Sequence, residues 1–126
     1  MNSNINILLV EDEEALGKIM TARLKEEGFG VDLFLTGEGI IPIVKKVKPN
    51  LVLLDILLPG KDGIEILKEL KSDPELKQIP VVMLTMLNDE IRIAEAMELG
   101  SRGYLVKGDY NLDMLAKTVK DILIKP

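Results

Sequence analysis

Hydrophobic residues in this sequence gather in five short segments of strand length, and the stretches between them have helical periodicity. The five segments are Ile5–Val10, Val31–Leu35, Leu51–Leu54, Val81–Leu84 and Gly103–Val106. The first, third and fourth are nearly continuous apolar runs, which is typical of strands buried on both faces of a sheet. The final stretch has the clearest helical pattern, because one stripe carries Leu112, Leu115, Ala116, Val119, Ile122 and Leu123.

Five repetitions of a strand followed by a helix predict an α/β fold, in which a doubly wound, five-stranded parallel sheet carries helices on both faces. We expect a single domain over residues 1–126, because this length suits one domain and no internal repeat or linker interrupts the pattern. Functional groups of such sheets lie beyond the carboxyl ends of the strands. The residues that end or follow each predicted strand are therefore the candidates for a site.

Glycine, asparagine and proline mark the expected ends of several helices. Gly28 and Gly100 predict helix C-termini, and Asn88 predicts a helix N-terminus. Pro42 has no amide hydrogen and would clash with a preceding helical turn. We therefore expect Thr36–Gly39 to be a loop and the second helix to begin near Pro42.

The amino-acid composition excludes several classes of chemistry. The chain has no cysteine and no histidine, which excludes thiol and imidazole chemistry and the common zinc ligands. Its net charge of −5 argues against nucleic-acid contacts by this domain. No apolar run approaches the roughly 20 residues that cross a membrane. No signal peptide is visible either, so we expect a cytoplasmic protein with no membrane partner.

Asp55 is the most informative residue at the predicted strand ends. It is the only polar residue in the stretch Leu51–Leu58. A carboxylate beside a buried strand is unfavourable unless a nearby group compensates its charge. A helix cap or a loop acid is the alternative for a single aspartate, but polar residues also end the neighbouring strands.

Glu11 and Asp12 follow the first strand, and with Asp55 they would bring three like charges close together. Such carboxylates repel one another unless a cation lies among them. Mg²⁺ meets that requirement, because it prefers about six oxygen ligands. A solvated acidic run at a helix start is the alternative for Glu11–Glu14, since the helix dipole favours acids there.

Thr85 and Lys107 end the fourth and fifth strands at the same edge of the sheet. Thr85 suits a helix cap or a bond to an anion, and Lys107 suits a structural ion pair or a phosphate contact. Three acids, a hydroxyl and a lysine around one metal are the components of phosphoryl transfer. The metal and the lysine neutralise phosphate oxygens while a carboxylate attacks.

Five pieces of the sequence together resemble the response-regulator receiver domain of two-component, histidine–aspartate phosphorelay signalling. The resemblance covers the whole chain and rests on Ile7–Glu13, Pro49–Asp55, Leu58–Gly63, Ile79–Thr85 and Gly103–Lys107. It implies the flavodoxin-like strand order 2-1-3-4-5.

The resemblance also implies the components of the phosphorylation site. Asp55 would be the phosphoacceptor, and its donor would be a sensor histidine kinase or a histidine phosphotransfer protein. Mg²⁺ would be bound directly by Asp12 and Asp55, through water by Glu11, and by the backbone carbonyl of Leu57. The domain would catalyse its own phosphorylation and dephosphorylation without a separate substrate, so we do not expect it to be an enzyme.

The expected signal leaves the site through two residues that bond the added phosphate, Thr85 and Lys107. Tyr104 would be an aromatic switch that turns inward as Thr85 moves. The face formed by helix 4, strand 5 and helix 5 would then change. This face is expected to contact an output domain, a downstream protein or a second copy of the chain.

Three positions depart from the pattern of the family. Gly108 stands where proline is usual, which is expected to loosen the loop after the last strand. Met86 stands where a small residue is commoner, and with Leu57 and Leu87 it adds bulk near the phosphoacceptor. This bulk predicts slow loss of the phosphate, because it hinders attacking water. Pro42 is the third departure and lies away from the site.

Three rival functions fit the sequence less well. A haloacid-dehalogenase-type phosphatase needs a second aspartate where Leu57 stands. A flavodoxin-like nucleotide or flavin binder needs a phosphate loop after the first strand, where Glu11–Glu14 would repel phosphate. A degenerate receiver, acting as a phosphorylation-independent interaction module, is the remaining alternative. It is less favoured because the acids, Thr85 and Lys107 are all present.

Overall fold

The computed structural model describes residues 5–86, 90–107 and 112–124. The strands in these ranges are β1 (Asn6–Val10), β2 (Gly30–Phe34), β3 (Leu51–Asp55), β4 (Val81–Thr85) and β5 (Gly103–Val106). The helices are α1 (Glu14–Glu26), α2 (Ile40–Val47), α3 (Gly63–Ser72), α4 (Glu90–Glu98) and α5 (Leu112–Leu123). Within the described ranges, no helix is long and apolar enough to cross a membrane.

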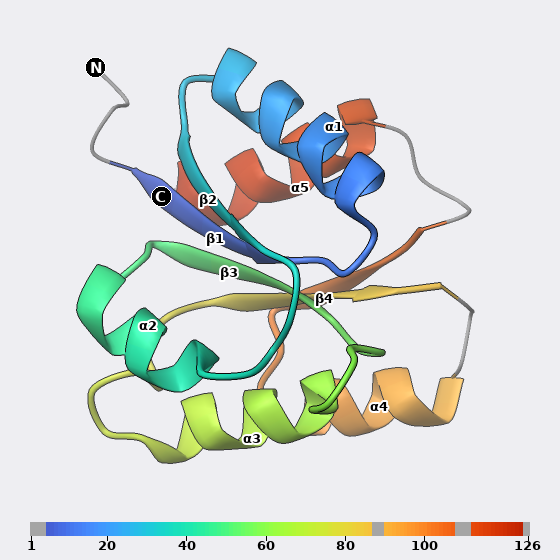
Figure 1. Cartoon of the computed structure of the whole chain (residues 1–126). Helices are drawn as coiled ribbons and strands as arrows, with labels where there is room; N and C mark the ends of the chain where they lie inside the picture. Colours follow the sequence, from blue (N-terminus) through green and yellow to red (C-terminus); the bar gives the residue numbers. More distant parts are fainter. Residues whose placement is uncertain (1–4, 87–89, 108–111, 125–126) are drawn as a thin grey trace.

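The five strands form one parallel sheet in the order β2-β1-β3-β4-β5 (Figure 1). Helices α1 and α5 cover one face, and α2, α3 and α4 cover the other (Figure 1). The predicted fold class and the strand order implied by the family resemblance are both confirmed.

Alternate residues of the strands divide the apolar interior into two layers. In β3, Val52 and Leu54 belong to the layer that α2, α3 and α4 cover. Leu51 and Leu53 belong to the layer that α1 and α5 cover. Each such buried side chain stabilises the fold by roughly 1.5–3 kcal/mol, which explains why the central strands β3 and β4 are apolar up to their last residues.

Each strand bound lies within one residue of the predicted segment, and β5 matches its segment at both ends. The strands β3 and β4 continue to Asp55 and Thr85, because the backbone ladder does not stop at a polar side chain. The Ile56 amide donates to the Leu84 carbonyl at 2.9 Å, and the Lys107 amide to the Thr85 carbonyl at 2.7 Å. Both polar residues are therefore held by the sheet itself.

The predicted helix ends are confirmed where the structure describes them. Gly28 and Gly100 follow α1 and α4 with φ angles of 100° and 106°, a region that favours glycine. Residues 36–39 form a loop, and α2 begins two residues before Pro42. Pro42 thus lies in the first helical turn, where its missing amide hydrogen has no intrahelical partner to lose. Asn88 lies outside the described residues, as do Leu87 and Gly108.

Helices α1 and α5 pack against each other as well as on the sheet. Leu24 of α1 and Leu115 of α5 are both fully buried in the same apolar layer. At the surface, Arg23 pairs with Asp113 at 2.7 Å. An exposed ion pair adds little stability, so the apolar contacts hold these two helices together.

Candidate functional site

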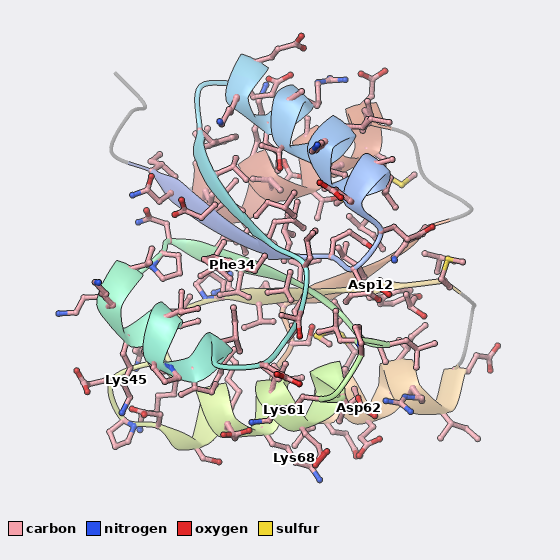
Figure 2. All side chains as sticks on the ribbon, viewed as in Figure 1. Asp12, Phe34, Lys45, Lys61, Asp62 and Lys68 are labelled. Carbon is pink, nitrogen blue, oxygen red and sulfur yellow. The ribbon has the colours of Figure 1, made fainter. Side chains whose placement is uncertain are left out.

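Four strands end at one edge of the sheet, and each end carries a polar side chain. Asp55 and Thr85 are the last residues of β3 and β4, while Glu11 and Lys107 follow β1 and β5. The parallel register brings these ends together. The side chains of Glu11, Asp55 and Lys107 are almost completely buried, and Asp12 lies exposed beside them (Figure 2).

The Lys107 ammonium lies between two buried carboxylates. Its Nζ donates to Asp55 Oδ2 at 2.7 Å and to Glu11 Oε2 at 3.0 Å. The Glu13 carboxylate, half exposed at the entrance, is 3.6 Å away. Of the alternatives for Lys107, the geometry in this structure is that of an ion pair, and its position beside Asp55 also suits a phosphate contact.

The three acids form a cluster that fits a hard divalent cation. One carboxylate oxygen from each of Glu11, Asp12 and Asp55 lies within 4.8 Å of the others. Glu11 Oε2 accepts from the Glu13 amide at 2.9 Å. Glu11 Oε1 is buried and 2.8 Å from Lys107 Nζ, but it has no hydrogen bond of good geometry. A buried acid oxygen in that condition and an all-oxygen donor set suit Mg²⁺.

Burial raises the pKa of Asp55 from 3.8 to about 7. Hydrogen bonding and charge attraction from Lys107 oppose this shift, whereas the Glu11 charge and a hydrogen bond with Asp12 add to it. Desolvation dominates because the Asp55 side chain is only 2% exposed. A cation among the acids would favour the ionised form that a nucleophile requires.

The same contacts have the opposite net effect on the lysine. Burial alone would lower the pKa of Lys107, but hydrogen bonds and charge interactions with Asp55 and Glu11 outweigh it. The pKa of Lys107 is therefore raised above its ordinary value, so the side chain stays cationic at the rim.

The remaining predicted site residues surround this cluster. Thr85 is buried at the end of β4, with 5% of its surface exposed. The Leu57 amide donates to Asp55 Oδ1 at 3.3 Å, while the Leu57 side chain is 57% exposed. Tyr104 lies on β5, the strand next to β4, and is 44% exposed, so its ring faces outward rather than into the core. Met86 is likewise exposed beside the end of β4.

Two features near the site were not predicted from the sequence. Gly63 packs so closely on the phosphoacceptor strand that a Cβ atom there would lie 2.1 Å from the Asp55 carbonyl oxygen. Asp62 caps α3 and also binds Arg92 of α4. The Asp62–Gly63 pair after Pro59–Gly60 was a visible signal in the sequence, but the partner on α4 was not.

A doubly wound sheet with a buried acid–lysine cluster at its strand ends defines a domain of the flavodoxin-like class. The family model described as response regulator receiver domain matches residues 7–120. This chain therefore belongs to the response-regulator receiver domains of two-component signalling, as its sequence predicts.

A curated relative supports this family assignment. The phosphate regulon transcriptional regulatory protein PhoB of Rhizobium meliloti (strain 1021) is 35% identical over 111 residues, which are 88% of this chain and 49% of that protein. The chain thus spans about half the length of this curated relative.

Two solved structures extend the similarity to the fold. The Mn(2+)-bound form of response regulator Rcp1 has a TM-score of 0.85 at 31% identity, covering 97% of this chain and 96% of that one. The BeF3-activated N-terminal receiver domain of Klebsiella pneumoniae RstA has a TM-score of 0.86 at 30% identity, covering 95% and 99%.

Proposed function

We propose that Asp55 is the phosphoacceptor of this domain and that its donor is a phosphohistidine of a sensor histidine kinase or histidine phosphotransfer protein. One observation carries the proposal: a buried Asp55 carboxylate bonded to the Lys107 ammonium inside a cluster of three acids. Residues 1–126 contain no histidine, so the phosphohistidine would lie outside this domain.

The transfer is a displacement at phosphorus. An oxygen of Asp55 attacks the phosphorus atom, the P–O bond forms, and the P–N bond to the donor imidazole breaks with its electron pair left on nitrogen. Charge on the phosphoryl oxygens must be stabilised during this step. Lys107, which is 2.7 Å from Asp55 Oδ2, would pair with one of these oxygens. The Thr85 hydroxyl would bond to another.

Asp12 and Asp55 would bind Mg²⁺ directly, Glu11 would bind it through a water molecule, and the Leu57 carbonyl would be a further ligand. When bound, the ion would supply positive charge that neutralises the acids and the phosphate oxygens. The Mn(2+)-bound form of the related Rcp1 supports a divalent metal in this family.

Phosphorylation would change the contacts available to the strand ends. An added phosphate brings more negative charge and more acceptor oxygens than the Asp55 carboxylate has. Thr85 and Lys107 would bind those oxygens more strongly than they bind Asp55, and this difference would shift the conformational equilibrium. Tyr104, outward in this structure, would turn inward and alter the face formed by α4, β5 and α5.

We propose that residues 1–126 act as one receiver unit in the cytoplasm and that the altered face contacts an output domain, a downstream protein or a second copy. The unit would catalyse only its own phosphorylation and dephosphorylation. A transcriptional output is consistent with the name of the PhoB relative. That protein is about twice as long as the segment that matches this chain.

Mass spectrometry after incubation with acetyl phosphate and Mg²⁺ tests this function. We expect a single phosphate adduct on the wild-type chain and none on Asp55→Asn. An adduct that persists in Asp55→Asn would assign the acceptor elsewhere. No adduct on the wild-type chain would favour a phosphorylation-independent interaction module.

A further inference from the structure

The first turns of α4 are tied to the loop that follows the proposed phosphoacceptor. Arg92 Nη2 lies 2.6 Å from Asp62 Oδ1 and 2.5 Å from Asp62 Oδ2. The two side chains are 31% and 35% exposed, so this pair is partly shielded from water. Charge-assisted hydrogen bonds of this kind are about twice as strong as neutral ones.

Asp62 stands at a junction whose position is set by the phosphoacceptor strand. Asp62 lies at the start of α3 (Figure 2), where its Oδ1 accepts from the Ile64 amide at 2.8 Å and so caps the helix. The amide of Gly63, the residue that follows Asp62, donates to the Ile56 carbonyl at 2.8 Å. With no Cβ on Gly63, the start of α3 lies directly against the Asp55 backbone.

Residues 56–62, here named the phosphoacceptor loop, are therefore fixed at both ends. At one end they leave β3, where the Leu57 amide donates to Asp55 Oδ1 at 3.3 Å. At the other end Asp62 is held by the α3 cap and by Arg92. Of these restraints, only the Arg92 contact comes from α4.

We propose that Arg92 is a positioning residue for the phosphoacceptor loop. Through Asp62 it holds the loop where Leu57 meets the Asp55 carboxylate, and the same ion pair couples this loop to α4. The inference rests on the proposed function of Asp55. Coupling between two sites is reciprocal. Since Arg92 of α4 restrains the loop beside Asp55, ligand binding at Asp55 also changes the environment of α4.

An ordinary ion pair in the same loop provides a matched control. Lys61, which lies next to Asp62 (Figure 2), pairs with Glu69 of α3 at a similar exposure of 36% and 46%. That pair joins the loop only to the helix that directly follows it. Lys61→Gln thus removes a comparable charge contact without touching the link to α4.

The test compares Arg92→Gln, Arg92→Lys, Asp62→Asn and the double variant Arg92→Gln/Asp62→Asn with Lys61→Gln. Asparagine caps helices as well as aspartate does, so Asp62→Asn removes the ion pair and keeps the cap. Lysine keeps the charge at position 92 but not the planar fork of arginine. Thermal unfolding identifies any variant that fails to fold, and the remaining variants still decide the question.

The first measurement is amide exchange and amide chemical shifts in the metal-free protein. Arg92→Gln should increase exchange at Gly63 and shift the Leu57 amide, whereas Lys61→Gln should leave both as in the wild type. The second measurement is an amide-shift titration with Mg²⁺, alone and with beryllium fluoride. Arg92→Gln should weaken the apparent affinity about fivefold, Arg92→Lys should recover part of it, and Asp62→Asn should match Arg92→Gln.

The α4 signals give the decisive signature. In the wild type, beryllium fluoride with Mg²⁺ should shift the amides of Ile93 and Ala96. In Arg92→Gln these shifts should shrink while those of Asp12 and Leu57 persist. The inference is wrong if Arg92→Gln behaves as Lys61→Gln does, or if the two single variants add in the double variant.

Failure of the inference differs from failure of the proposed function. A wild-type chain that takes no phosphate from acetyl phosphate refutes the role of Asp55. The metal-free exchange at Gly63 still decides whether Arg92 holds the loop. A phosphorylated wild type with Arg92→Gln indistinguishable from Lys61→Gln refutes only the positioning role.

Discussion

Removing the Asp55 carboxylate should stabilise the metal-free domain at alkaline pH. Asp55→Asn keeps the size of the side chain and replaces a buried acid with a neutral amide. The wild-type pKa of Asp55 is raised from 3.8 to about 7, chiefly by burial. A neutral side chain cannot incur this penalty for ionisation.

The sign and the size of this stability difference follow from the linkage between proton binding at Asp55 and folding. Between pH 3.8 and about 7, the folded chain keeps a proton on Asp55 that the unfolded chain has lost. The contribution of protonated Asp55 to stability therefore falls as pH rises through this window. This contribution is fully lost above the pKa of the folded state. At about 1.4 kcal/mol per pKa unit, the whole window corresponds to a loss on the order of 4 kcal/mol. About 2 kcal/mol of it should appear between roughly pH 5.5 and pH 8.5.

Urea denaturation in EDTA measures this difference. The free energy of unfolding of Asp55→Asn minus that of the wild type should grow by about 2 kcal/mol from about pH 5.5 to about pH 8.5. Titrating groups that do not contact Asp55 are shared by the two proteins, so their contributions cancel in this comparison. Mg²⁺ at roughly ten times its dissociation constant should return about 1.4 kcal/mol to the wild type. Parallel pH profiles of the two proteins in EDTA would refute the reasoning.

Three further variants test the site from other directions. Gly63→Ala should destabilise the fold by at least about 2 kcal/mol, because its Cβ would meet the Asp55 carbonyl oxygen at 2.1 Å; an unchanged urea midpoint would contradict this packing. Lys107→Met should raise the pKa of Asp55 further above about 7, since the lysine lowers it, and carboxyl-carbon NMR titration without metal would measure the shift. Met86→Ala combined with Leu57→Ala should speed loss of the phosphate about tenfold, because both side chains are exposed beside the site. A wild-type phosphate lifetime of only seconds in Mg²⁺ would already argue against that last expectation.

Hydrophobicity alone was sufficient to predict the fold class, whereas the strand order came from the family resemblance. The apolar runs that became β1, β3 and β4 must be buried on both faces, and five alternations of strand and helix leave few parallel topologies. The apolar segments stop one residue before Asp55 and Thr85, but these polar residues were predicted to end their strands, and hydrogen bonding along the ladder does continue to them. Lys48, which ends α2 with a φ of 52° where glycine is usual, carries no sequence signal beyond the following Pro49.

The cluster of Glu11, Asp55 and Lys107 could be predicted because parallel strands deliver their carboxyl ends to one edge. The sequence could not predict that Lys107 would already be bonded to both Glu11 and Asp55, because that depends on how deeply the side chains are buried. The Asp62–Arg92 pair was also beyond prediction. A single arginine on an amphipathic helix looks the same in sequence whether it faces water or a neighbouring loop.

The packing of α5 on α1 has a practical consequence for reporters of signalling. Leu115 and Leu24 share one apolar layer, on the side of the sheet opposite α4. A fluorophore fused after α5 would therefore follow the orientation of α1, and a dye on α4 would follow the opposite layer. Energy transfer between the two would record movement of one helical layer relative to the other, whereas labels on α1 and α5 would report movement within one layer.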